Sequence, residues 1–266
     1  MKGDKAHYFR SNADKARDAR SEETATDTTT IEGGQVRDRT VVVAGASSAA
    51  GRATAAALVA AGARVVVVGS NAERLADVAA HARYVCDLAD ADAVTELAEL
   101  IRSEVGPPDG LVHLVGGWRA GHDAEGWAWL EERLITTLRN TTVAFRDDLM
   151  ASPAGRLAIV SSTMVDLPTW SNANYAAAKA AAEAWVKAMA TSFTHAKRTA
   201  SVPGGTGGTV IPFDPGVVTA AAVTFVVHAI GTGEGKVPVA MLANAIAGMW
   251  DLPSDELNGA RVSFTV

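Results

Sequence analysis

The 266-residue chain is poor in cysteine, in long apolar runs and in positive charge. Its single cysteine, Cys86, excludes a disulfide within the chain, and its place near the end of an apolar run favours a buried, unreactive thiol. No apolar run reaches the roughly 18 residues of a membrane span, and the first residues are charged where a secretory signal would be apolar. We therefore expect a cytoplasmic protein with no membrane partner.

Charge balance and missing motifs exclude several further classes of function. The net charge of −6 gives no reason to expect a nucleic-acid partner. No zinc-ligand spacing is present, so we expect no metal. The glycine-rich stretch 202–208 lacks the Lys-Ser or Lys-Thr of a phosphate-binding P-loop, and Ser161 and Ser162 lack the flanking glycines of a hydrolase nucleophile. We therefore expect a small molecule as the substrate.

The chain divides by composition into a leader and a single folded domain. Residues 1–38 are polar with nearly balanced charges, and we interpret them as a mobile leader. A short helix around 12–20, or an arm anchored on a neighbouring subunit by residues 7–9, also fits this composition. With 48% hydrophobic and 20% charged residues, the chain can form one large α/β domain over residues 39–266.

From residue 40 onward, apolar strand-like runs alternate with helix-length segments. This alternation predicts a Rossmann-type α/β fold, a doubly wound sheet of about seven mostly parallel strands with helices on both faces. We interpret the stretch 202–208 as a flexible insertion before the sixth expected strand. The expected strands are 41–44, 64–68, 83–85, 110–115, 156–160, 209–211 and 261–265, and the expected helices are 52–61, 72–80, 91–105, 125–150, 173–194 and 238–250.

A turn of small residues joins the first expected strand to the first expected helix. From residue 41 to 51 the sequence reads Val-Val-Val-Ala-Gly-Ala-Ser-Ser-Ala-Ala-Gly. Backbone N–H groups of such a turn and of the helix start would face the pyrophosphate of a dinucleotide. Gly45 permits the tight turn, and Gly51 lets the helix close on the strand. An ordinary strand-to-helix turn is the alternative interpretation.

A Tyr-x-x-x-Lys spacing joins Tyr175 and Lys179 on an alanine-rich helix, and Ser162 ends a strand thirteen residues before the tyrosine. Four residues are about one helical turn, so the two side chains share a face. A cation close to a phenol, whose ordinary pKa is about 10, favours the phenolate and lowers that pKa. Tyr175 could then act as acid or base while Ser162 hydrogen-bonds the same substrate oxygen.

Together the two motifs resemble the short-chain dehydrogenase/reductase family over essentially the whole folded domain. The family's glycine pattern is Thr-Gly-x-x-x-Gly-x-Gly, and here Ala44 replaces the Thr and Ala49 the middle Gly. The extra methyl would weaken cofactor binding without abolishing it. The resemblance implies an NAD(P)-dependent oxidoreductase that moves hydride between nicotinamide and a small carbonyl or alcohol. In such an enzyme Tyr175 would exchange the proton with the substrate, Lys179 would hold the cofactor ribose and Ser162 would orient the substrate oxygen.

The end of the second expected strand bears on the choice of cofactor. In this family a protein that selects NAD usually has Asp or Glu there, which binds the ribose 2′-OH and repels a 2′-phosphate. Gly69 takes that place here, and Ser70 falls where NADP-using relatives often carry Arg. Arg74 and Arg52 are near enough in sequence to supply positive charge. We expect NADP(H) to be preferred, with NAD(H) as the alternative.

The resemblance implies the rest of the cofactor site residue by residue. Asp87 would contact the adenine, although capping the next segment is its alternative role. The backbone at Gly116 would approach the ribose. The segment 214–219 matches the family's Pro-Gly-x-x-x-Thr, one residue shorter, which holds the nicotinamide carboxamide. The implied cofactor contacts are Gly45, Ser47, Ser48, Ala50, Gly51, Ser70, Asn71, Arg74, Asp87, Leu88, Val115, Gly116, Tyr175, Lys179, Pro215, Gly216, Val218 and Thr219.

Two positions depart from the family pattern. The family has Asn-Asn-Ala-Gly where this chain has His113-Leu-Val-Gly, and Thr137 stands at its catalytic Asn, with Asn140 one turn later. The Gly-Gly-Trp segment 116–118 resembles dihydropteridine reductases, which also lack that Asn. Two alternatives follow: reduction of a quinonoid or imine substrate, or a catalytically weak protein that binds or senses the cofactor. The retained Ser162 and the missing acidic NAD-selecting residue argue against a close match to that branch, and the retained Ser162, Tyr175 and Lys179 argue against the second alternative.

Four residues near these motifs are candidates for the substrate pocket. Trp118 and His122 lie on the loop after the fourth expected strand, and Thr163 and Trp170 lie between the catalytic Ser and Tyr. The flat ring of Trp118 could stack on a substrate ring. A tryptophan that closes the core and a surface histidine are the alternative interpretations.

The helix expected over 173–194 bears on assembly because it is unusually rich in alanine. Small side chains let helices approach closely, and in the family this helix and the long one before it commonly pack against a second subunit. We expect a symmetric homodimer or homotetramer. The high helix propensity of alanine is the alternative explanation.

Overall fold

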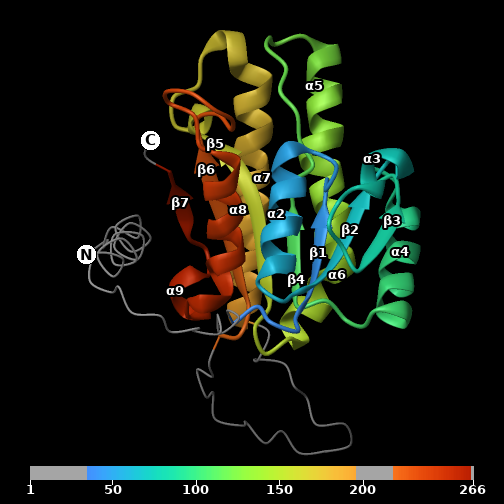
Figure 1. Ribbon diagram of the computed structural model, residues 1–266. Coiled ribbons are helices and arrows are strands. Elements are labelled where there is room, and N and C mark those ends of the chain that lie inside the picture. The colour runs from blue at the N-terminus through green and yellow to red at the C-terminus, as the bar shows by residue number, and fades with distance from the viewer. Residues whose placement is uncertain (1–34, 196–217, 265–266) are drawn as a thin grey trace, which may run out of the picture.

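The computed structural model describes residues 35–195 and 218–264, and within these ranges a sheet of seven parallel strands forms the centre of the molecule (Figure 1). The strands are β1 (Thr40–Ala44), β2 (Arg64–Gly69), β3 (Ala82–Val85), β4 (Gly110–His113), β5 (Arg156–Ser162), β6 (Ala221–Val227) and β7 (Arg261–Ser263). Their order in the sheet is β3-β2-β1-β4-β5-β6-β7, and every neighbouring pair is parallel. The predicted doubly wound, Rossmann-type fold is confirmed.

Helices cover both faces of this sheet. They are α2 (Ala49–Ala60), α3 (Ala72–Ala76), α4 (Ala91–Glu104), α5 (Ala124–Glu131), α6 (Thr137–Ala151), α7 (Ala173–His195), α8 (Val239–Ala247) and α9 (Ser254–Leu257). On one face α2 packs against α8, and on the other α6 packs against α4 and α7 (Figure 1). Alternate strand residues enter the two cores, Val41 and Val43 on one side and Val42 and Ala44 on the other. Within the described ranges, no helix is both long and apolar enough to span a membrane.

The segment predicted as one helix over 125–150 is α5 and α6 joined by a π-helical turn, Glu132–Thr136. A π turn holds one residue more than an α-helical turn, so it rotates the side chains on either side of it relative to each other. The predicted helix over 72–80 is the shorter α3.

The sixth strand along the chain differs from the prediction. β6 pairs with β5 over its whole length, whereas the predicted strand 209–211 and the glycine-rich stretch 202–208 lie outside the described residues. Every residue of β6 is buried, as the run Ala-Ala-Val-Thr-Phe-Val-Val favours for a parallel strand covered on both faces. The segment that resembles Pro-Gly-x-x-x-Thr precedes this run, and placing a strand before that segment caused the error.

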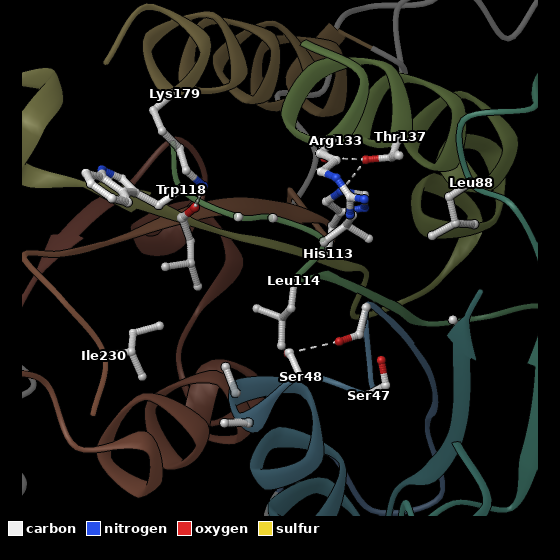
Figure 2. A pocket seen from close by; sticks show the side chains of 18 of the residues that line it. Ser47, Ser48, Leu88, His113, Leu114, Trp118, Arg133, Thr137, Lys179 and Ile230 are labelled. Atoms are coloured by element: carbon white, nitrogen blue, oxygen red, sulfur yellow. Dashed lines mark hydrogen bonds between the residues drawn. The ribbon is translucent and has the colours of Figure 1, made fainter. Parts of the chain in front are cut away.

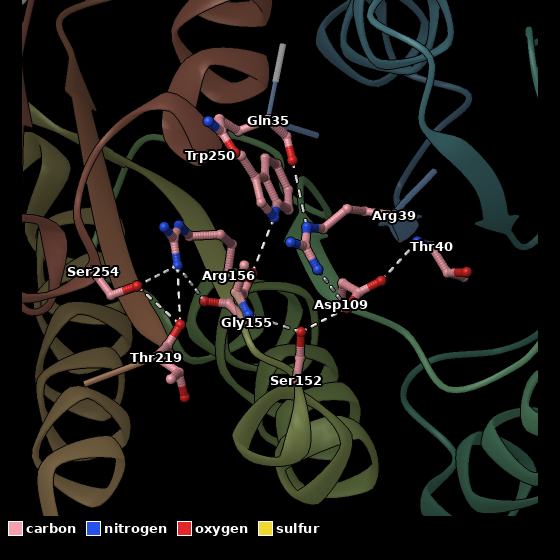
Figure 3. Close-up of polar contacts among 11 residues, drawn as sticks. Gln35, Arg39, Thr40, Asp109, Ser152, Gly155, Arg156, Thr219, Trp250 and Ser254 are labelled. Carbon is pink, nitrogen blue, oxygen red and sulfur yellow. Dashed lines mark hydrogen bonds and ion pairs between the residues drawn. The ribbon is translucent and has the colours of Figure 1, made fainter. Parts of the chain in front are cut away.

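Two polar side chains tie together the amino ends of the strands (Figure 3). Asp109 accepts hydrogen bonds from the Thr40 N–H at 3.0 Å and from Ser152 Oγ at 2.6 Å. Arg156, at the start of β5, is buried, and burial lowers its pKa to about 10. Its guanidinium donates to the Ser254 hydroxyl and to the carbonyl groups of Gly155, Thr219, Met249 and Leu252. Hydrogen-bonded polar side chains therefore occupy the edge of the sheet at which the amino ends of the strands lie.

The folded domain begins slightly before the predicted boundary at residue 39. Val36 is buried in the core on the α2 side of the sheet, and the Gln35 N–H donates to Asp251 Oδ1 at 3.0 Å. Residues 35–38 therefore belong to the domain. The rest of the predicted leader lies outside the described residues.

Candidate functional site

A cleft of about 1310 Å³ opens at the carboxyl ends of the central strands (Figure 2). The winding of the chain reverses between β1 and β4, and doubly wound sheets bind their ligands at this point. Within the described ranges, no three His, Cys or carboxylate side chains gather as metal ligands would. The predicted site residues that line the cleft are Gly45, Ser47, Ser48, Ala50, Ser70, Arg74, Asp87, Leu88, Val115, Gly116, Trp118, Ser162, Tyr175 and Lys179.

The turn between β1 and α2 requires glycine at two places. Gly45 has a φ of +77°, and a Cβ there would lie 2.7 Å from the backbone of Leu114. A Cβ on Gly51 would lie 2.5 Å from the Gly45 carbonyl oxygen, so Gly51 closes the helix on the turn from behind the cleft wall. Ser48 caps α2, since its Oγ accepts from the Gly51 N–H at 3.0 Å. This closely packed turn at a helix N-terminus suits the diphosphate of a dinucleotide.

One end of the cleft has an arginine and no acid at the end of β2. Gly69 ends that strand and lines the cleft together with Ser70 and Arg74. Backbone groups hold Arg52, which donates to the carbonyl oxygens of Ser47 and Arg74. The Arg74 guanidinium has no carboxylate partner among the described residues, so its charge is available to a ligand.

Two of the predicted cofactor contacts cap local structure. Asn71 lies off the cleft wall and caps α3, since its Oδ1 accepts from a backbone N–H of that helix at 2.9 Å. Asp87 lines the cleft, and its Oδ1 also accepts from the Ala89 N–H at 3.0 Å. Asn140 supports the same loop by donating to the Leu88 carbonyl at 3.1 Å. It therefore does not take the place of the family's catalytic Asn.

Ser162, Tyr175 and Lys179 line one wall of the cleft. Burial raises the pKa of Tyr175 above its ordinary value of 10, and the hydrogen bond with Ser162 opposes that shift. The predicted effect of Lys179 on this pKa is not among the causes of the shift, and Nζ of Lys179 donates to the Val160 carbonyl at 2.7 Å, with 5.9 Å between Nζ and the centroid of the Tyr175 ring. A phenol that keeps its proton is suited to act as an acid.

A carboxylate lies one helical turn beyond Lys179. Burial lowers the pKa of Lys179 to about 8, and the charge of Glu183 opposes that shift. Glu183 is itself buried and accepts hydrogen bonds from Ser161 Oγ at 2.6 Å and Arg261 Nε at 2.9 Å. Helix α7 therefore presents Tyr175, Lys179 and Glu183 at successive turns, and an ion pair to β7 fixes the last of them.

His113, at the end of β4, is buried between two hydroxyl groups of α6. Its Nε2 lies 3.2 Å from Thr137 Oγ1, and its Nδ1 lies 3.1 Å from Thr141 Oγ1. Burial, and then the charge of Lys179, lower the pKa of His113 to about 3, so the imidazole is neutral at physiological pH. A neutral imidazole donates to one of these hydroxyls and accepts from the other.

The four residues predicted for the substrate pocket separate in the structure. Trp118 lines the cleft with 57% of its surface exposed. His122 and Trp170 stack on each other with ring centroids 4.3 Å apart, and neither lines the cleft, because a backbone hydrogen bond joins their two loops. Thr163 does not line the cleft either, although its Oγ1 is 3.3 Å from Nδ1 of His228, which does. Of the four residues predicted for the substrate pocket, Trp118 is therefore the one that lines this cleft.

Two residues of the segment predicted to hold the nicotinamide carboxamide, Val218 and Thr219, do not line the cleft. Val218 and Thr219 precede β6, at the amino end of that strand, where the Thr219 carbonyl accepts from Arg156 at 3.2 Å. Pro215 and Gly216 lie outside the described residues. Among the described residues, those that directly follow β6 line the cleft, because it opens at the carboxyl ends of the strands. The residues there that line it are His228, Ala229, Ile230 and Gly231.

Arg133 lies on the π turn and lines the cleft, although no sequence motif indicated it. Its guanidinium carbon lies 4.6 Å from the centroid of the Trp129 ring. A π turn has no local sequence signature, and a single arginine on a helix is by default a solvated residue. Nothing in the sequence therefore distinguished Arg133 from its neighbours.

Comparison with known sequences gives one family match and several relatives. A family model described as short chain dehydrogenase matches residues 39–211. The 2,3-dihydro-2,3-dihydroxybenzoate dehydrogenase of Bacillus subtilis is 28% identical over 166 residues, which cover 58% of this chain and 64% of that protein. The probable oxidoreductase EphD of Mycobacterium tuberculosis is 32% identical over 218 residues, covering 77% of this chain and 35% of that protein. The chain thus spans less than two thirds of the length of each relative.

Solved structures share the same architecture. An NADPH-bound short chain oxidoreductase of Pseudomonas aeruginosa with an atypical catalytic center superposes with a TM-score of 0.70 at 20% identity, covering 85% of this chain and 96% of that chain. A metagenomic short-chain oxidoreductase in complex with NADP gives a TM-score of 0.69 at 21% identity, with coverage of 88% and 100%. At these identities the likeness establishes the fold.

Proposed function

Because the chain belongs to the short-chain dehydrogenase family, we propose that it is an NADP(H)-dependent oxidoreductase acting on a small carbonyl or alcohol. The observation that supports this most strongly is that Ser162, Tyr175 and Lys179 line the same cleft as the glycine turn. A protein that only bound the cofactor would not need all three side chains at that wall.

In the proposed reaction each of these side chains has a separate task. The nicotinamide, when bound, supplies or accepts the hydride. Tyr175 gives its phenolic proton to the oxygen of a carbonyl under reduction, or takes that proton from an alcohol. Ser162 Oγ hydrogen-bonds the same oxygen and orients it. Lys179 holds the cofactor ribose through its ammonium group, which is charged below a pKa of about 8.

The preference for NADP(H) is supported by charge at one end of the cleft. No acid at the end of β2 would repel a 2′-phosphate, and Arg74 lines the cleft without a carboxylate partner among the described residues. The guanidinium of Arg74 could pair with a 2′-phosphate, which NAD(H) lacks.

The exposed ring of Trp118 favours a second candidate substrate. It lies at the cleft beside Gly117, and a flat quinonoid or imine ring could stack on it. Such a substrate would still receive its proton from Tyr175.

Fluorescence titration with NADPH and NADH, followed by turnover on small carbonyls and a quinonoid dihydropterin, tests the proposal. We expect NADPH to bind roughly tenfold more tightly than NADH, since only NADPH engages Arg74. If neither dinucleotide binds, the proposal is wrong. Tight binding without turnover on any substrate would favour a cofactor-binding protein instead.

A further inference from the structure

Arg133 places a guanidinium at the cleft without an acidic partner. Among the described residues, no carboxylate lies within ion-pair distance of it, and its ring contact is Trp129, with 4.6 Å from the guanidinium carbon to the ring centroid. Arg119 lies 4.8 Å from the same ring, but it pairs with Glu125 at 3.2 Å and does not line the cleft. Of these two arginines, Arg133 is therefore the one available to a ligand.

The turn that carries Arg133 packs on the strand end next to the glycine turn. A Cβ on Gly116 would lie 3.7 Å from Cδ2 of Leu134, a residue of the π turn, so the turn contacts the segment that follows β4. Gly45 approaches the same short segment at Leu114, 2.7 Å from where its own Cβ would lie. The contacts of the π turn and the glycine turn, at Gly116 and Leu114, are thus only two residues apart along the chain.

Figure 2 shows where the guanidinium lies relative to the expected diphosphate site. Arg133 enters from the helix side of the cleft, opposite Ser47 and Ser48 of the glycine turn. In the same view it lies between Leu88, at the expected adenine end, and Trp118, at the expected nicotinamide end. The middle of an extended dinucleotide, where its diphosphate is, would pass between Arg133 and the glycine turn.

We propose that Arg133 binds the diphosphate of the dinucleotide from the side opposite the glycine turn. This inference rests on the proposed cofactor, and it adds a residue that neither the sequence motifs nor the resemblance indicated. The glycine turn offers backbone N–H groups and hydroxyls, whereas a guanidinium neutralises charge and binds phosphate oxygens in pairs. Stacking on Trp129 restrains the guanidinium and leaves its N–H edge free.

The charges around the cleft agree with an anionic ligand. The charged side chains that line it are Arg74, Arg133 and Lys179, which are basic, and Asp87 and Glu132, which are acidic. Arg74 and Lys179 are assigned above to the 2′-phosphate and the ribose. Among the described residues, the diphosphate would have no cationic partner in the cleft without Arg133. Ala49, which adds a methyl to the cleft wall where the family has glycine, increases the need for one.

Equilibrium titration of the full chain with NADPH, NADH, ADP and adenosine 2′-monophosphate tests this role. We expect Arg133→Met to weaken NADPH, NADH and ADP by a similar factor, roughly tenfold to a hundredfold. Adenosine 2′-monophosphate should bind unchanged, because it has no diphosphate. The affinities of Arg133→Lys for NADPH, NADH and ADP should lie between those of the parent chain and those of Arg133→Met, because lysine keeps the charge and loses the paired N–H groups. Arg119→Met is the matched control and should bind all four ligands as the parent chain does.

The possible results separate three conclusions. Unchanged ADP affinity in Arg133→Met would overturn the inference. So would a loss confined to NADPH and adenosine 2′-monophosphate, which would assign Arg133 to the 2′-phosphate. If the parent chain bound none of the four ligands, the proposed cofactor itself would be wrong. Thermal unfolding of each variant identifies loss of fold, and Arg133→Lys decides the question if Arg133→Met does not fold.

Discussion

His113 and Thr137 occupy the two positions at which this chain departs from its family, and they are in contact, with 3.2 Å between Nε2 and Oγ1. The family has asparagine at both positions, one after the fourth strand and one in the long helix. Both residues are buried here, and a buried polar group left without a partner costs roughly 1–3 kcal/mol. The two departures are therefore linked, because the His113 imidazole and the Thr137 hydroxyl are hydrogen-bond partners of each other.

This burial predicts that acid destabilises the protein through His113. Its pKa is about 3 in the folded protein, against roughly 6.5 in the unfolded chain. Between these values the unfolded chain binds the proton and the folded protein does not, so stability falls as pH falls from 6.5 toward 3. The loss is on the order of 4 kcal/mol if the structure stays intact. Urea unfolding between pH 4 and 7 measures it.

The variant His113→Asn separates this effect from general acid denaturation. Asparagine does not titrate, so the free energy of unfolding should fall less steeply between pH 6.5 and 4 than in the parent chain. His122→Asn, at an exposed position, should keep the parent slope. Equal slopes for all three proteins would show that His113 is protonated in the folded state.

The fold was predictable because its signals extend over whole elements. The valines of β1 and β2 form continuous apolar runs, which a parallel strand buried on both faces requires. The sixth strand was misplaced because a short resemblance, at 214–219, outweighed the stronger apolar run of β6. The run was the better guide, since burial of seven consecutive residues fixes a strand more firmly than a six-residue motif.

The candidate site was predictable only where local geometry determines it. Tyr175 and Lys179 share a helix face at any register, so their spacing was sufficient. Arg133 depends on a π turn, and His228 reaches the cleft only because β6 ends just before it. Trp170 stacks on His122 and does not face the cleft, because the two loops that carry these residues pair with each other. No pattern along the chain encodes that contact.

We expect Tyr175→Phe to keep NADPH affinity and to lose turnover by roughly a hundredfold to ten-thousandfold, because only the proton donor is removed. Lys179→Ala should lose both NADPH affinity and turnover, because the contact of Lys179 with the cofactor ribose is removed as well. Tyr84→Phe is the matched control, because its hydroxyl bonds Glu104 away from the cleft. Fluorescence titration and steady-state kinetics measure the two effects. Full activity in Tyr175→Phe would mean that another acid operates, with His228, which also lines the cleft, as a candidate.

We expect Gly69→Asp to shift the cofactor preference from NADPH toward NADH by about tenfold or more, because the carboxylate binds the ribose 2′-OH and repels a 2′-phosphate. The site can accept the side chain, since a Cβ there would meet Leu75 Cδ2 at 3.3 Å, the end of a flexible side chain. Gly69→Asn is the control of equal size without the charge. If both variants changed the preference equally, the repulsion would not be its cause.

Glu183→Gln should lower the pKa of Lys179 below about 8, because the Glu183 charge opposes the lowering caused by burial. Lys179 loses its proton above its pKa, so NADPH binding should weaken at a lower pH in the variant than in the parent chain. Titrations from pH 6 to 9 measure this midpoint. Glu104→Gln should leave it unchanged, because that carboxylate bonds Tyr84. An unmoved midpoint in Glu183→Gln would show that Lys179 does not control binding.

The exposed face of α7 bears on assembly. Of its alanines, Ala177, Ala180, Ala181, Ala184 and Ala188 are exposed, while Ala176, Ala178, Ala182 and Ala190 are buried. On the neighbouring α6, Val143 is 62% exposed. An apolar face of small side chains on two adjacent helices could pack closely against a symmetry-related copy.

We therefore expect a symmetric homodimer or homotetramer that buries α6 and α7, and Ala181→Arg should convert it to a monomer. A guanidinium at each of two facing positions would clash and repel across a two-fold axis. Ala56→Arg is the matched control, because that exposed alanine lies on α2, on the opposite face of the sheet. Light scattering at micromolar concentration measures the mass of each protein. A monomeric parent chain would refute the prediction and leave helix propensity as the reason for the alanines.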